Sequence, residues 1–117
     1  MKNLKSGLII DEPWIDLILK GEKIWEVRGT NSKKRERIFL IKKGTKSIVG
    51  EADLVDSRLL DLDDFIKGYD YHKIPINGRR LPYKNTWAWT LTNVKIYEIP
   101  TLYSHPNGAV IWVNFNR

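Results

Sequence analysis

The chain has 117 residues, of which 42% are hydrophobic and five are Trp, and this is enough for one domain with one packed core, expected over residues 1–117. The absence of Cys and of any apolar run of about 18 residues argues against a disulfide scaffold, a thiolate zinc site, a secretory signal and a membrane-spanning helix, and it favours a cytoplasmic protein with no metal or cofactor. The formal net charge of +6 favours a polyanionic partner, although a solvated basic surface without any partner accounts for it equally well.

The first two predicted elements are a short buried strand over residues 7–10 and a helix directly after it. Asp11 is a candidate N-cap and Pro13 is typical of a first helical turn. Apolar side chains over residues 14–19 form a broad stripe, and Gly21 is a typical stop signal. The pattern therefore predicts a helix of about two turns that packs on a core.

From Lys23 onward the hydrophobic period changes to two, which predicts a strand over residues 23–28. Strand alternation places Glu26 and Arg28 on one face and Lys23 on the opposite face. The polar and basic residues 29–37 that follow are expected to form a loop.

Residues 38–41 and 47–55 are predicted to form a hairpin of two strands. Gly50 lies inside the second strand, where glycine marks a bulge or a close approach of another segment. Residues 61–67 then carry three Asp near their start, which predicts a short acidic helix ended by Gly68.

The remaining chain is predicted as a long surface loop followed by two strands. The loop, over residues 69–85, contains several turn residues, and loops of this length are often functional. Residues 86–98 predict a long strand with a kink near Asn93, and Pro100 is expected to break it. Residues 109–115 predict a final strand, and their continuous apolar run suggests burial on both faces.

These elements amount to five or six short strands and two short helices, with no internal repeat and no linker. The fold class is therefore expected to be α+β, mainly β: a small mixed-topology β-barrel whose helices plug its ends.

Charge is distributed in three blocks along the chain. Residues 1–50 hold 12 basic and 6 acidic side chains, residues 51–70 hold 2 and 7, and residues 71–117 hold 6 and 1. A fold that joins the two basic blocks would present one positive and one negative face. The acidic block allows an alternative function, a regulatory adaptor that docks a basic partner through residues 61–64.

The sequence lacks a phosphate-cradling glycine loop, a nucleophile elbow and a metal-binding His pair at helical spacing. The side chains that could bind a ligand or take part in catalysis instead cluster within the fifteen positions 14–28: Trp14, Lys20, Lys23, Trp25, Glu26 and Arg28. A Lys, a carboxylate and an Arg at a strand end either pair with one another as a structural network or line a pocket that binds an anion and a polar base edge.

A further set of motifs runs through the chain: Gly7-Leu8-Ile9-Ile10, Pro13-Trp14, Gly21-Glu22-Lys23, Glu26-Val27-Arg28, Trp87-Ala88-Trp89 and residues 105–113. With these motifs the chain resembles the ASCH domain family over nearly its whole length. The resemblance implies a PUA-like β-barrel, a fold used for binding RNA and modified nucleobases, with a cleft between the barrel and its first helix.

Some small bacterial ASCH proteins are amidohydrolases that remove acetyl from acetylcytidine, and the resemblance implies for them a catalytic Lys, Thr and Glu. Lys23 matches the Lys, whereas Glu26 occupies the position of the Thr. A Lys–Glu pair at this spacing favours an ion pair that holds Lys23 protonated. Other ASCH proteins are ribonucleases or nucleic-acid binders.

The predicted binding mode places one nucleobase in the cleft, stacked on Trp14 or Trp87, with its polar edge facing Glu26 and Arg28. Basic side chains would hold the phosphates: Lys23, Lys33, Lys34, Arg35, Arg79 and Arg80.

Each of these assignments has a competing structural interpretation. Trp25 and Trp112 lie among apolar strand residues and are expected in the core. The basic run around Lys34 is equally typical of a solvated loop, and His105 is typical of a turn.

The first hypothesis is thus a module that binds RNA or another single-stranded nucleic acid, or a modified nucleoside, with no membrane partner and an oligomeric state that the sequence leaves open. The second is a hydrolase of a modified nucleoside or of RNA, with Lys23 as catalytic amine and Glu26 as its acid/base partner.

Overall fold

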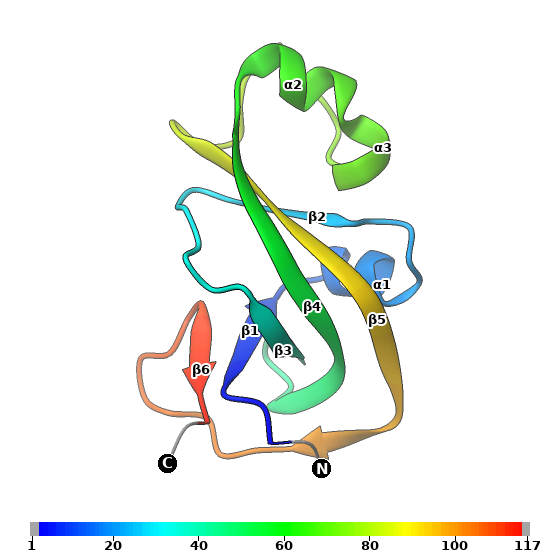
Figure 1. Ribbon diagram of the computed structural model, residues 1–117, viewed down its shortest axis with the longest axis vertical. Helices are drawn as coiled ribbons and strands as arrows, with labels where there is room; N and C mark the ends of the chain where they lie inside the picture. Colours follow the sequence, from blue (N-terminus) through cyan, green and yellow to red (C-terminus); the bar gives the residue numbers. More distant parts are fainter. Residues whose placement is uncertain (1–2, 116–117) are drawn as a thin grey trace.

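The computed structural model describes residues 3–115, which form one mixed sheet of six strands and three short helices (Figure 1). In chain order the elements are β1 (Ser6–Ile10), α1 (Trp14–Leu19), β2 (Trp25–Arg28), β3 (Glu36–Lys42), β4 (Ser47–Leu60), α2 (Leu62–Lys67), α3 (Tyr69–His72), β5 (Thr86–Leu102) and β6 (Trp112–Asn114). Within the described range no helix has the length and apolar character needed to cross a membrane.

The strand order is β2-β5-β4-β3-β1-β6. Only the β1–β3 pair is parallel; the other neighbouring pairs in the described sheet are antiparallel. Because β2 and β6 stand at opposite ends of that order, the described ladder is not closed, although the long bent strands β4 and β5 give it a barrel-like form (Figure 1). The predicted mainly β, mixed-topology fold is confirmed, with one more helix than expected.

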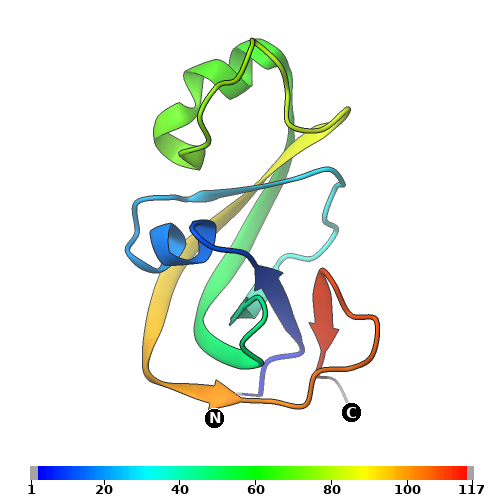
Figure 2. The same ribbon diagram turned by 180° about the vertical axis from the view of Figure 1, so that it is seen from behind.

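The helices lie in two places. Seen from behind, α1 packs beside β5 and β1, whereas α2 and α3 form one end of the molecule, far from β6 and the two chain ends (Figure 2). The main core lies between α1 and the sheet, where Ile15 and Ile18 of the helix pack against sheet residues such as Leu8 and Trp89. Burial of these side chains contributes about 1.5–3 kcal/mol each to folding.

Helix α2 follows the rules that the sequence predicted. The Asp61 carboxylate accepts a hydrogen bond from the Asp64 N–H, and the Asp64 carboxylate accepts one from the Asp61 N–H, so the N-terminus has a reciprocal capping box. The helix ends at Gly68, as predicted, and a side chain has no room there, because a Cβ would lie 2.5 Å from the Trp25 indole.

The prediction that the Asp11 side chain caps α1 is wrong. The helix begins after Pro13, and no side chain caps its N-terminus. The backbone carbonyl of Asp11 accepts from the Ile15 N–H at 3.0 Å, while its carboxylate accepts from the Glu12 N–H at 2.9 Å.

The predicted irregularities in the long strands, at Gly50 and near Asn93, are confirmed. A Cβ on Gly50 would lie 2.6 Å from the backbone oxygen of Lys95, and the β4–β5 register shifts beside it. Asn93 adopts φ 51°, and the register shifts at the same place, so β5 bends there.

Several predicted boundaries are wrong. β3 begins at Glu36 and β4 continues to Leu60, each beyond the expected range. β5 runs through Pro100 to Leu102, because Pro100 lies at a register shift where the sheet requires no N–H from it. Of the strand predicted over residues 109–115, only the part Trp112–Asn114 forms, as β6.

That last strand is also less buried than its apolar run suggested. β6 stands at the end of the described sheet and pairs only with β1, and Val110 before it is 75% exposed. The predicted loop over residues 69–85 is partly wrong as well, since it begins with α3 and is irregular only from Lys73 onward.

Candidate functional site

Lys23 is buried between α1 and β2, with 1% of its surface exposed. Gly21, at φ 79°, turns the chain off the helix, and the Lys23 N–H still bonds to the Leu17 carbonyl at 3.2 Å. The Lys23 Nζ donates to the backbone oxygen of His72 at 2.6 Å and lies 3.8 Å from Glu26 Oε1. The prediction that Lys23 points away from Glu26 is wrong, because β2 begins at Trp25 and strand alternation does not reach back to Lys23.

Glu26 and Arg28 lie side by side on β2, as strand alternation predicted. Arg28 Nε and Nη2 both donate to Glu26 Oε2, at 2.9 and 2.8 Å, and Nη2 also donates to the backbone oxygen of Ile9 at 2.7 Å. Glu26 is buried and the Arg28 side chain is 16% exposed. Lys23, Glu26 and Arg28, hereafter the pocket cluster, thus form the ion-pair network that the structural interpretation expected.

Burial dominates the electrostatics of this cluster. Desolvation lowers the pKa of Lys23 to about 8, against an opposing effect of the Glu26 carboxylate and with a smaller lowering from Arg28. The predicted Lys23–Glu26 ion pair is present and raises the pKa of Lys23, but burial lowers that pKa by more. At neutral pH Lys23 is mostly an ammonium, but its proton is held far less tightly than that of an exposed lysine.

The backbone carbonyl that accepts the hydrogen bond from Lys23 belongs to His72, a residue that sequence reasoning did not identify. Its Nε2–H donates to the Phe65 oxygen at 2.7 Å, since a carbonyl can only accept, and its Nδ1 accepts from the Ile74 N–H at 2.8 Å. The ring stacks on Phe65 with centroids 4.1 Å apart, and burial lowers its pKa. His72 is therefore a neutral, fully bonded residue that fixes the α3 end against Lys23.

The pocket cluster opens into a pocket of about 350 Å³. Trp14 lies on one side, with Lys23 Nζ 4.9 Å from its ring centroid. The charged side chains that line the pocket are three cations and two carboxylates: Lys23, Arg28, Lys43, Asp11 and Glu26. The pocket is thus positively charged by one unit when all five groups are ionised.

The loop after α3 also lines the pocket, through Ile74, Pro82 and Tyr83. Tyr83 is half exposed and is a second aromatic residue in the pocket lining, which sequence reasoning missed. No periodic pattern places this loop, although its length had marked it as a functional segment.

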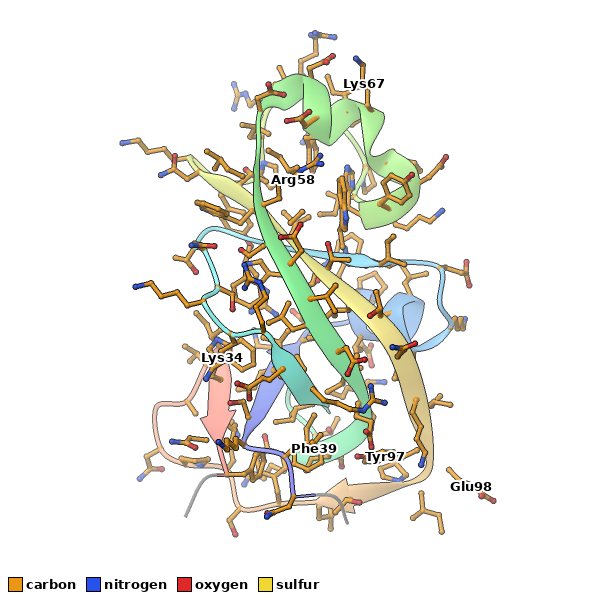
Figure 3. The ribbon with its side chains drawn as sticks, viewed as in Figure 1. Lys34, Phe39, Arg58, Lys67, Tyr97 and Glu98 are labelled. Atoms are coloured by element: carbon orange, nitrogen blue, oxygen red, sulfur yellow. The ribbon has the colours of Figure 1, made fainter. Side chains whose placement is uncertain are left out.

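Trp87 does not line the pocket, unlike Trp14. It stands opposite Arg28 in the β2–β5 ladder, half-buried, and packs against the main core. Trp25 packs on the core cluster around Phe65, with the Arg58 guanidinium 5.2 Å from its ring (Figure 3). Trp112 stacks on Trp89 with ring centroids 5.8 Å apart.

The other predicted phosphate-binding residues lie away from the pocket walls. Lys34 stands 5.3 Å from the Trp112 ring, beside β6 (Figure 3). Arg35 Nη1 donates to the oxygens of Ser32 and Lys34 at 2.7 and 2.8 Å, which braces the loop. The remaining three, Lys33, Arg79 and Arg80, are exposed.

A second group of polar side chains lies on β3, β4 and β5 and is hereafter called the sheet cluster: Arg37, Glu51, Asp53 and Tyr97. Arg37 donates to Glu51 through Nε and to Asp53 through Nη1, the latter at 2.9 Å. The Tyr97 hydroxyl donates to Glu51 Oε1 at 2.9 Å, at the lower end of β5 in Figure 3. Burial and this bond raise the pKa of Tyr97 to about 12.

The pocket cluster combines an amine of lowered pKa, a carboxylate and a guanidinium beside two aromatic rings. Such a set can bind an anion, hydrogen-bond a polar ring edge, or move a proton. Among residues 3–115 no group of three or more His, Asp or Glu side chains could hold a metal ion.

Comparison with known proteins gives one family and one fold. The model of the ASCH domain matches residues 8–101. The crystal structure of ASCH from Zymomonas mobilis superposes with a TM-score of 0.72 at 15% identity, covering 96% of this chain and 87% of that one. Two mutant structures of that protein match with the same score and identity and with 88% and 90% of their chains covered. No curated protein matches the sequence.

Proposed function

The chain belongs to the ASCH domain family, and we propose that it is a nucleic-acid-binding module whose pocket takes one nucleobase of a single-stranded RNA or of a modified nucleoside. The observation that carries this proposal is the pocket cluster itself. A buried Lys and Glu and a partly buried Arg, beside two aromatic residues, form a site that is costly to fold and suited to a flat, polar ligand.

Stacking supplies the affinity in this proposal. Trp14 and Tyr83 both line a cavity of about 350 Å³, which is within the range of small-ligand pockets. A base between or against these rings gains roughly 1–3 kcal/mol.

Hydrogen bonds supply the selection. The Arg28 bonds within the described chain use Nε and Nη2, which leaves Nη1 for an acceptor on the ligand. Lys23 offers further N–H groups beside its bond to His72. A base edge rich in acceptors, such as a carbonyl next to a ring nitrogen, fits these donors better than an edge rich in N–H groups.

A hydrolase is the second candidate, and the lowered pKa of Lys23 favours it. With a pKa of about 8, a fraction of Lys23 is a neutral amine at pH 7 and can take a proton from water. The water oxygen would bond to an acetyl carbonyl carbon, and Lys23 would return the proton to the amine nitrogen as the C–N bond breaks. Acetylcytidine and water would thus give cytidine and acetic acid, with Glu26 as the acid/base partner of the lysine.

One experiment separates the two candidates. The protein is incubated with the four ribonucleosides and with acetylcytidine, products are separated by chromatography, and Trp fluorescence is recorded in parallel. A fluorescence change without product supports the binding module. Release of cytidine from acetylcytidine supports the hydrolase and makes the binding module the wrong description.

Two matched variants test whether binding or turnover takes place at the pocket cluster. Lys23→Met removes the buried amine but keeps the length and volume of the side chain, whereas Lys20→Met removes an exposed amine three residues away. We expect Lys23→Met to lower affinity or turnover at least tenfold and Lys20→Met to change neither. Equal responses of the two variants would exclude the pocket cluster as the site.

A further inference from the structure

A second groove adjoins the pocket and shares part of its wall. Its volume is about 290 Å³, and it lies between the inner strands and the segment that links β5 to β6. Three residues line both spaces: Ile9, Lys43 and Val110. The two cavities are therefore neighbours, and Val110, which lines both, is 75% exposed.

The wall of this groove is an aromatic pair held by a chain of hydrogen bonds. His105 Nε2–H donates to the Ala109 oxygen at 2.9 Å, so Nδ1 is the acceptor for the Tyr103 hydroxyl at 2.7 Å. The Tyr103 ring packs edge-on against Phe115 with centroids 5.7 Å apart. Tyr103 and His105 thus present ring surfaces whose orientation is fixed before any ligand arrives.

The floor is apolar and the rim is basic. Ile9 and Ile41 form the buried floor, and Lys43 and Lys46 stand exposed at the β3–β4 turn. No carboxylate is among the described side chains that line the groove. The nearest acidic partner of this rim is Asp11, 3.9 Å from Lys43 Nζ at the border with the pocket.

We propose that this groove is a second subsite, which takes the nucleotide adjacent to the one held in the pocket. An apolar floor with a fixed ring wall suits a nucleobase, and the two lysines suit the phosphate that joins it to its neighbour. A strand that crosses from one cavity to the other also covers the exposed Val110. This inference rests on the proposed function and makes the ligand a single strand of at least two nucleotides.

The test measures how affinity grows with ligand length. Isothermal titration calorimetry compares the best-bound ribonucleoside with the dinucleotides that carry it at either end. The variants are His105→Ala, which removes an exposed ring, and Tyr103→Leu, which removes the ring while keeping an apolar side chain. Lys67→Gln is the control, because Lys67 lies on α2 at the far end of the molecule (Figure 3).

We expect one dinucleotide to bind wild type and the Lys67→Gln variant about tenfold more tightly than the nucleoside, as one further stacked base predicts. Both ring variants should lose this gain and keep the affinity for the nucleoside. His105→Ala keeps the test decisive if Tyr103→Leu does not fold, since Tyr103 also packs against Phe115.

Other outcomes overturn the inference in distinguishable ways. If the nucleoside binds but no dinucleotide binds more tightly, or if the gain survives in both variants, the second subsite is wrong and the proposed function stands. If neither nucleosides nor dinucleotides bind, both fail. Shifts of the Ala109 and Val110 amide resonances caused by an apolar tripeptide, and not by a dinucleotide, would assign the groove to a peptide instead.

Discussion

The pocket cluster and the sheet cluster are built from similar parts and have opposite properties. In each, a buried carboxylate on a strand binds an Arg through its guanidinium: Glu26 with Arg28, and Glu51 with Arg37. The third member decides the difference. The sheet cluster adds a second carboxylate, Asp53, and the pocket cluster adds a buried lysine.

This difference sets both charge and protonation. The sheet cluster carries one cation and two carboxylates, with a tyrosine hydroxyl bonded to Glu51 as well, and its Arg cannot release a proton. The pocket cluster carries two cations and one carboxylate, and its lysine can lose its proton near neutral pH. The comparison teaches that an ion pair in a strand has structural or chemical value according to its third member: a second carboxylate adds only charge, whereas a buried lysine adds a proton that can be released.

The largest expected effect comes from removing the two carboxylates in turn. Glu26→Gln takes away the carboxylate that Arg28 binds, and since the charge of Arg28 is permanent we expect a loss of about 3 kcal/mol in the free energy of unfolding, although Lys23 can become neutral. Glu51→Gln leaves Arg37 bonded to Asp53 and partly exposed, so we expect a smaller loss of about 1–2 kcal/mol at pH 7. Urea unfolding measures both.

Ligand affinity provides the control for this pair of variants. Glu26→Gln should weaken nucleoside binding, and Glu51→Gln should leave it unchanged in the folded protein, since Glu51 does not line the pocket. Equal losses of stability with no change in affinity for either variant would mean that the pocket cluster is only structural.

The lowered pKa of Lys23 should make the stability of the protein depend on pH in the alkaline range, which the sheet cluster's Arg37 cannot do. Its folded pKa of about 8 lies below the unfolded value of 10.5, so between these pH values the unfolded chain binds more protons and stability rises with pH. The gain is about 3 kcal/mol, because each pKa unit corresponds to about 1.4 kcal/mol. We expect wild type to gain this relative to Lys23→Met when both are unfolded in urea from pH 7 to 10.5. Parallel pH curves would show that Lys23 keeps an ordinary pKa.

The sheet cluster should respond to alkaline pH with the opposite sign. The pKa of Tyr97 is raised from 10 to about 12, so the folded protein keeps a proton that the unfolded chain loses, and stability falls as pH rises through this range. Tyr97→Phe removes this group but not the ring. We expect the variant to lose less stability than wild type between pH 10 and 12 in the same urea experiment, and an identical loss would contradict the role of the Tyr97 hydroxyl.

Local rules are enough to account for part of this arrangement. The capping box of α2 depends on Asp61 and Asp64, which are three residues apart. The shared face of Glu26 and Arg28 follows from strand alternation alone. The bends at Gly50 and Asn93 were predictable because glycine and asparagine are unfavourable inside a regular strand and are found there mainly where it bulges or bends.

The rest depended on contacts between distant parts of the chain. Lys23 meets the carbonyl of His72, 49 residues away, and no periodicity in the sequence relates the two. Tyr83 reaches the pocket from an irregular loop. Trp87 was expected at the cleft because of its type, but the packing of β5 places it against the core instead. The residues close together in sequence, Lys23, Glu26 and Arg28, were therefore predictable, whereas those that reach the site from distant segments were not.

The smallest effect is expected from the basic side chains of the loop around Lys34, since they are neither buried nor next to the pocket. Lys33 is exposed and Lys34 stands over Trp112, so both can reach a strand that continues past the cavities. We expect Lys33→Gln to lower affinity for single-stranded RNA about equally for all sequences. It should also flatten the slope of log affinity against log salt by roughly 0.7 per lost phosphate contact.

Lys95→Gln, an exposed change on β5, is the matched control for this measurement. Arg35 is left unchanged in the test because its bonds to Ser32 and Lys34 brace the loop, and its loss would mix folding with binding. Fluorescence anisotropy at several salt concentrations, with two unrelated RNA sequences, gives both slope and specificity. An unchanged slope would remove the loop from the binding surface and confine recognition to the cavities, whereas a loss for one sequence only would mean that Lys33 contacts a base.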